Sequence, residues 1–132
     1  MKTNKEIVQA IYDAFGQANI PFILESVAEN FTHFDPSDPA VAPQGGRHSG
    51  RAEFLGFFQK LGDSVDTTLW EVDNIIADKE EVVATGKHGV TVKKTGKKGV
   101  IEWVMVWHFE GNQPVSIRNY YDTARYEALY QN

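Results

Sequence analysis

The sequence of 132 residues contains no cysteine, which excludes disulfide bonds, thiolate zinc sites and cysteine nucleophiles. Basic residues are few as well: thirteen Lys and Arg stand against eighteen Asp and Glu, a net charge of −5. Nucleic acid is therefore not an expected partner, since binding it usually needs a basic surface. No apolar run is long enough to span a bilayer or to form a signal peptide, and a strongly apolar run such as 103–107 is short. We therefore expect a cytoplasmic protein without membrane contact.

What the sequence does contain is the composition of a globular domain. Hydrophobic residues make up 42% of the chain and charged residues 23%, which excludes disordered and low-complexity classes. A chain of this length buries roughly two-thirds of the surface that its unfolded form exposes, enough for a real core. Because no repeat or linker divides it, residues 1–132 are expected to form a single domain.

Helical spacing dominates the first part of the chain. Thr3 and Glu6 form a capping box, and the apolar residues behind them predict a helix over 4–17. Asn19 caps a second, shorter helix, whose expected buried residues are Phe22, Ile23 and Val27. A third helix over 51–61 is expected to bury Phe54, Leu55, Phe58 and Leu61.

A short strand over 31–35 and a loop over 36–50 lie between the second and third helices. The loop is rich in proline and glycine and long for a compact domain, so we expect it near the mouth of a pocket. After the third helix the hydrophobic period changes to two, which predicts strands over 66–77, 81–93, 99–110 and 114–121. Asp122 caps a closing helix that runs through Tyr130. The order predicts an α+β fold in which a curved antiparallel sheet wraps around three N-terminal helices as a cone.

Strand alternation assigns the side chains that face the inside of this cone. In the strand over 99–110, one face carries Trp103, Met105, Trp107 and Phe109. In the last strand the more apolar face carries Ile117, Asn119 and Tyr121. His33 and His88 fall on the same inward side of their strands.

This organisation resembles the nuclear transport factor 2-like (NTF2-like) superfamily, specifically its SnoaL-like, ketosteroid-isomerase-related branch. The resemblance covers essentially the whole chain and rests on the order of five segments: Ile7–Phe15, Ala18–Pro21, Gly45–Gly50, Trp103–Gly111 and Ile117–Ala124. It implies a cystatin-like conical α+β barrel with a deep pocket, commonly dimeric. The branch includes isomerases, cyclases, epoxide hydrolases and non-catalytic binders.

The catalytic positions of these relatives are mostly changed in this chain. By the resemblance, the carboxylate base of ketosteroid isomerases falls at His33, their protonated acid at Met105, and their first-helix tyrosine at or beside Ile11. The arginine and two aspartates of limonene-epoxide hydrolases fall at Gly86, His88 and Asn119. Asparagine cannot take a proton at neutral pH, so neither mechanism carries over intact.

The candidate catalytic residues are His33 and His88 as general base, with Asn119 or Tyr121 steadying an oxyanion. In a competing interpretation the two histidines are hydrogen-bonded polar residues that line a binding pocket. In a third interpretation they bind a metal ion together with Asp35, as two histidines and one carboxylate. The expected ligand-binding residues are Phe15, Phe31, Trp103, Met105, Trp107, Ile117 and Tyr121.

The sequence therefore predicts a small-molecule-pocket protein that needs no cofactor and no metal. It would be an isomerase, cyclase or hydratase acting on a small hydrophobic carbonyl or hydroxyl compound. Two alternatives stay open: a non-catalytic binding protein for an apolar small molecule, and a dimeric scaffold subunit. A homodimer is expected through the outer face of the sheet, at Val104, Val106, Arg118 and Tyr120.

Overall fold

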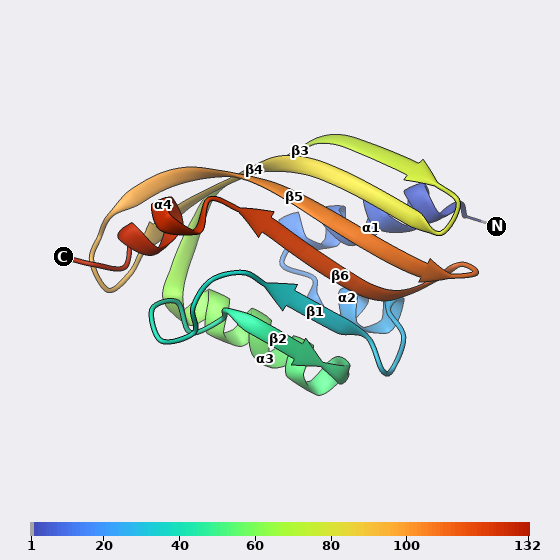
Figure 1. The fold of residues 1–132 in the computed structure, drawn as a ribbon, viewed down its shortest axis with the longest axis horizontal. Helices are drawn as coiled ribbons and strands as arrows, with labels where there is room; N and C mark the ends of the chain where they lie inside the picture. Colours follow the sequence, from blue (N-terminus) through green and yellow to red (C-terminus); the bar gives the residue numbers. More distant parts are fainter. Residues whose placement is uncertain (1) are drawn as a thin grey trace.

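The computed structural model describes residues 2–132 as a curved six-stranded sheet with three helices against one face and a short fourth helix at one end (Figure 1). In chain order the elements are α1 (Asn4–Gly16), α2 (Ile20–Ser26), β1 (Thr32–Asp35), β2 (Gly46–Ser49), α3 (Gly50–Ser64), β3 (Val65–Asp78), β4 (Glu81–Val92), β5 (Lys98–Glu110), β6 (Gln113–Tyr121) and α4 (Thr123–Ala128). The α+β class predicted from the sequence is confirmed. In the described residues, no helix is long and apolar enough to cross a membrane.

The strand order in the sheet is β2-β1-β6-β5-β4-β3. All neighbouring pairs are antiparallel except β1 and β6, which are parallel, so the sheet is mixed rather than purely antiparallel. β2 lies inside the segment predicted to be a loop. Its four residues carry no alternating pattern, and it forms because each of them pairs with a residue of β1.

Three helices, α1, α2 and α4, begin where their capping residues predict. The Glu6 amide donates to Thr3 Oγ1 at 3.2 Å and the Thr3 amide to Glu6 Oε1 at 2.9 Å, which completes the capping box. The Phe22 amide donates to Asn19 Oδ1, and the Arg125 amide to Asp122 Oδ1. These caps satisfy amides that the first helical turn leaves free.

The predicted burial of two helix side chains is wrong. Phe22 is 39% exposed and Leu55 is 36% exposed, although both were expected to be buried. In α3 the buried residues are Phe54 and Phe57, because that helix turns a slightly different side to the sheet than its apolar spacing suggested.

The inward face of the sheet follows the predicted alternation. Trp103, Trp107 and Phe109 on β5, and Ile117 on β6, are all buried between the sheet and the helices. Register shifts within β3, and between β5 and β6, mark bulges, which bend strands and increase their twist. A second, smaller core lies at the end of the sheet under α4 and contains Tyr126 and Tyr130.

Candidate functional site

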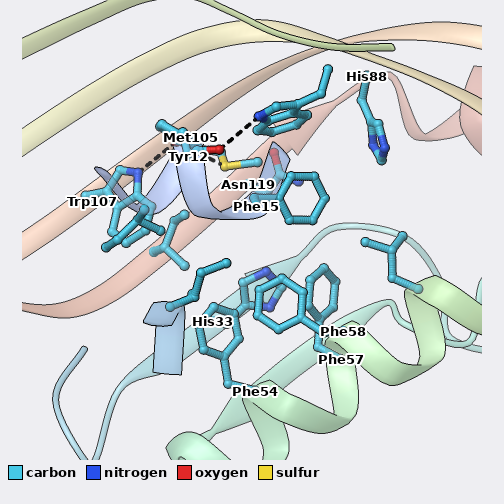
Figure 2. A pocket seen from close by; sticks show the side chains of 15 residues that line it. Tyr12, Phe15, His33, Phe54, Phe57, Phe58, His88, Met105, Trp107 and Asn119 are labelled. Atoms are coloured by element: carbon cyan, nitrogen blue, oxygen red, sulfur yellow. Dashed lines mark hydrogen bonds between the residues drawn. The ribbon is translucent and has the colours of Figure 1, made fainter. Parts of the chain in front are cut away.

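A cavity of about 90 Å³ lies between the inward face of the sheet and α1, α2 and α3. Figure 2 shows phenylalanines of α3 on one side, facing Tyr12, Met105, Trp107 and Asn119 on the other. The wall is mostly aromatic and aliphatic, with few polar groups, as is usual for small-molecule sites. Its lining residues are Ile11, Tyr12, Phe15, Ile23, His33, Phe54, Phe57, Phe58, Leu61, Trp70, His88, Met105, Trp107, Ile117 and Asn119.

The cavity approaches the surface between the C-terminal ends of α1 and α3. Phe15, Phe58, Leu61 and Trp70 line both the cavity and a neighbouring groove. Residues 36–50, which were expected near the mouth, contribute no lining residue to the cavity. The part of this segment before β2 packs toward α4 instead, where Gln44 Nε2 donates to the hydroxyls of Tyr126 and Tyr130 at 2.7 Å each.

Tyr12 ties α1 to the sheet at the closed side of the cavity. Its hydroxyl accepts a hydrogen bond from Trp107 Nε1 at 2.8 Å and donates to Met105 Sδ at 3.2 Å (Figure 2). Burial raises the pKa of Tyr12 above its ordinary value, so the hydroxyl stays protonated. The network fixes the positions of Met105 and Trp107 in the wall.

His33 on β1 forms a buried pair with His48 on β2. Their Nδ1 atoms lie 3.0 Å apart, so one ring donates and the other accepts. Burial, together with the nearby His48, lowers the pKa of His33 to about 3, and burial also lowers the pKa of His48. Both rings are therefore neutral at pH 7, and the pair links the two strands as a neutral hydrogen bond.

His88 on β4 lies in a different part of the wall. Its Nε2 and the Thr67 hydroxyl are 2.9 Å apart, and its ring is nearly perpendicular to those of Phe15 and Trp70. Burial lowers the pKa of His88 to about 4. This imidazole is neutral at pH 7 as well.

A smaller cavity of about 40 Å³ adjoins the first and contains a carboxyl group in its wall. Asp35 Oδ1 accepts from the Tyr121 hydroxyl at 2.6 Å and from the Ser37 amide at 3.0 Å, and the Ser37 hydroxyl lies 2.6 Å from that of Tyr121. Burial raises the pKa of Asp35 to about 6, against the opposing effect of these hydrogen bonds. The two cavities share Leu61, Trp70, His88, Met105 and Asn119.

Two polar atoms in these walls are buried without a hydrogen-bond partner among the described residues: Asn119 Oδ1 and Trp103 Nε1. Asn119 lines both cavities and Trp103 the smaller one. Buried polar groups are nearly always paired in folded proteins, so an unpaired one in a cavity wall indicates a place where a ligand or water binds.

The structure brings most of the predicted site residues to one place. His33, His88, Asn119, Phe15, Met105, Trp107 and Ile117 line the larger cavity, and Trp103 and Tyr121 line the smaller one. Phe31 lines neither: it is fully buried in the core, with its ring 4.9 Å from that of Phe54. Within residues 2–132, no hydrogen bond joins His33, His88 and Asn119 to one another.

Tyr12, Trp70 and Asp35 are among the wall residues that were not predicted as part of the site. Tyr12 lies four residues after the buried Val8 on α1, a helical spacing that could have indicated it. Trp70 is on β3, whose bulges break the alternation. Asp35 shares the inward alternation of His33 and was considered only as a metal ligand, yet it is the one carboxylate among the buried residues of the described chain.

The metal set of His33, Asp35 and His88 is not assembled. Across residues 2–132, no three His, Cys, Asp or Glu side chains come close enough together to hold an ion.

A curved mixed sheet wrapped around three helices, with a mostly apolar cavity between the two layers, defines the class of α+β fold to which this domain belongs. The family model of the SnoaL-like domain matches residues 8–117, and the chain belongs to this family, within the NTF2-like superfamily. A comparison with curated proteins finds no match.

Solved structures of similar fold extend over the whole chain. An NTF2-like protein of unknown function from Burkholderia pseudomallei is 25% identical, with a TM-score of 0.90 and 100% of both chains covered. An NTF2-like protein from Burkholderia xenovorans is 27% identical, with a TM-score of 0.84, covering 98% of this chain and 95% of that one. A candidate polyketide cyclase from Pseudomonas putida is 21% identical, with a TM-score of 0.77 and 98% of both chains covered.

Proposed function

We propose that the protein is a cofactor-independent enzyme that moves a proton on a small hydrophobic carbonyl or hydroxyl compound, with Asp35 as its general base. Such a step is part of an isomerisation or a cyclisation. The observation that carries the proposal is the buried Asp35 carboxyl in the wall of a cavity that adjoins the larger apolar one.

The electrostatics of the three candidate bases favour Asp35 over the histidines. A general base works best when its pKa lies near the working pH, because it is then both deprotonated and strongly basic. The pKa of Asp35 is raised to about 6, whereas those of His33 and His88 are lowered to about 3 and about 4. An imidazole with so low a pKa is a weak base.

The surroundings of Asp35 support the same role. Both hydrogen bonds that it accepts from the described residues end on Oδ1, which leaves Oδ2 to take a proton. Tyr121 and Ser37 hold the carboxyl in one orientation, and Asn119 shares the cavity wall with it. The likeness in fold to a candidate polyketide cyclase fits an activity of this kind.

The test follows the exchange of carbon-bound hydrogen for deuterium in small cyclic ketones, by proton NMR in heavy water. Asp35 takes a proton from the carbon next to the carbonyl, and a deuteron returns to that carbon. We expect exchange to rise with pH, to be half-maximal near pH 6 and to level off at higher pH, because only the deprotonated carboxylate is the base. Asp35→Asn should slow exchange by about 10²-fold or more.

The matched control is Asp38→Asn, which changes an exposed carboxylate three residues away and keeps an oxygen that can accept from Ala40. It should exchange as the wild type does. The proposal fails if no ketone exchanges faster than in buffer, or if Asp35→Asn exchanges as fast as the wild type.

A second candidate function is binding of an apolar small molecule without chemistry. It is favoured by the larger cavity itself, whose two histidines are both neutral at pH 7. This function predicts ligand affinities that Asp35→Asn leaves unchanged, together with no deuterium exchange in any variant.

A further inference from the structure

Asn119 has an unusual position for an amide side chain. It is on β6, is only 8% exposed, and stands in the walls of both cavities. Its Oδ1 has no hydrogen-bond partner among the described residues. An unsatisfied buried acceptor destabilises a protein, so the site is incomplete until something donates to this oxygen.

Apart from Trp103 Nε1, which has no partner either, the other polar groups of the walls form hydrogen bonds elsewhere. His33 pairs with His48, His88 pairs with Thr67, and the Tyr121 hydroxyl donates to Asp35. None of these bonds ends on Asn119. Trp103 Nε1 does not donate to Asn119 either, so the missing donor is assigned to a molecule inside the cavity.

The rest of the wall sets the size and character of that molecule. The larger cavity presents the rings of Phe15, Phe57 and Phe58. Its volume of about 90 Å³ and the adjoining 40 Å³ are together of the order of the ~150 Å³ apolar cavity that accepts a benzene ring. A space of this size limits the occupant to about one small ring.

We propose that Asn119 determines ligand specificity by selecting small ring compounds that carry a hydroxyl group, whose hydrogen its Oδ1 accepts. The ring occupies the larger cavity, and the hydroxyl lies at the junction with the smaller cavity, on the side of Asp35. This inference rests on the proposed function in one respect only, that the cavity is the substrate site, and it names the substrate class of that site.

The test compares three probes of nearly equal size by fluorine NMR: 4-fluorophenol, 4-fluoroanisole and 4-fluorotoluene. Only the phenol can donate a hydrogen bond, while the anisole keeps the oxygen without the hydrogen. We expect the phenol to bind the wild type about tenfold more tightly than either of the others, the usual effect of satisfying one buried acceptor. Equal binding of all three probes, tighter binding of the anisole, or no binding would overturn the proposal.

Two variants locate the preference at Asn119. Asn119→Leu keeps the approximate volume and removes the acceptor, so the phenol preference should fall to within about twofold. Tyr120→Phe changes the next residue, which is 43% exposed, and should keep the full preference. If Asn119→Leu keeps the preference, the proposal is wrong. Should that variant not fold, the wild-type comparison of phenol with anisole decides by itself.

The phenol-binding test and the deuterium-exchange test can fail independently of each other. Asp35→Asn should retain the phenol preference, because the carboxyl is not the group that accepts the hydroxyl hydrogen. Asp35-dependent deuterium exchange without a phenol preference would overturn this inference and leave the catalytic proposal standing. A phenol preference without deuterium exchange would support this inference and overturn the catalytic proposal.

Discussion

A buried carboxyl such as Asp35 weakens the fold whenever it is charged. Its pKa is raised to about 6 in the folded protein from an ordinary value of 3.8, so the folded state binds the proton more tightly. Stability is therefore lost as pH rises through this interval and stays reduced above pH 6.

We predict that Asp35→Asn increases the free energy of unfolding by about 2–3 kcal/mol at pH 8 and by about 1 kcal/mol at pH 4.5. The amide oxygen can still accept from Tyr121 and Ser37, so the packing is kept. Urea denaturation at the two pH values measures the effect, with Asp38→Asn as the control that should change little. A variant less stable than the wild type at pH 8 would contradict the raised pKa.

Gly86 is required because the ring of Trp103 lies against it. A Cβ at this position would be 2.3 Å from Trp103 Cζ2 and 2.1 Å from the Glu71 carbonyl oxygen. We predict that Gly86→Ala lowers the free energy of unfolding by about 1–3 kcal/mol, since a well-packed wall cannot absorb the methyl group. Thermal unfolding measures it.

The control for this prediction is Gly56→Ala. Gly56 is inside α3, and no atom comes within 4 Å of an added Cβ. Alanine should stabilise the helix by about 0.5–1 kcal/mol. If both alanines had the same effect, the close contact at Gly86 would not be the cause.

For single residues, the sequence predicts which side of the sheet a side chain faces better than it predicts the hydrogen-bond partners or the pKa of that side chain. Alternation along the strands places His33, His88 and Asn119 on the inward side, as the structure has them. It cannot indicate that His33 pairs with His48, because His48 is on a strand that forms only through long-range pairing. The low pKa values of the histidines and the raised one of Asp35 depend on burial depth, which a periodic pattern does not give.

At the scale of elements, the segment before β2 and the helix α4 depend on each other. Gln44 is 1% exposed and connects them through its hydrogen bonds to Tyr126 and Tyr130. We predict that Gln44→Ala increases amide hydrogen exchange over 36–45 and 123–130, while exchange in β3–β6 stays as it is. Mass spectrometry of peptides measures this.

The control for Gln44 is Gln113→Ala, an exposed glutamine at the start of β6. It should leave exchange over 36–45 and 123–130 unchanged. Faster exchange throughout the whole sheet in Gln44→Ala would instead mean that Gln44 supports the entire fold.

The helices and long strands could be predicted because each has a local signal. Capping residues marked the starts of α1, α2 and α4, apolar spacing marked α3, and alternation marked β3 to β6 to within a few residues. β2 and the parallel pairing of β1 with β6 could not be predicted, because both depend on which distant strand becomes a neighbour. The burial of Asp35 at the end of β1 was missed for a related reason: the wall around it comes from α3, α4 and β3 to β6, which are distant in the chain.

At the scale of the whole molecule, the outer face of the sheet remains the expected dimer interface. Val104 and Tyr120 are 39% and 43% exposed there, beside the exposed Arg118. We predict a homodimer that buries about 800 Å² per partner, a standard interface. Light scattering at micromolar concentration should give twice the chain mass, and Val104→Glu should give the monomer.

The control introduces the same negative charge on the helical layer, on the other side of the sheet from the predicted interface. Leu55 on α3 is 36% exposed, and Leu55→Glu should leave the dimer intact. A wild-type protein that scatters as a monomer would contradict the predicted interface.

All three tryptophans of the chain stand in the cavity walls: Trp70 and Trp107 line the larger cavity, and Trp70 and Trp103 the smaller one. Trp70 and Trp103 are stacked, with ring centroids 5.1 Å apart and planes within 14°. The intrinsic fluorescence of the protein therefore arises almost entirely around the site, without a background from distant indoles. The chain carries its own optical reporter, and an unlabelled compound library can be screened for occupants by emission alone.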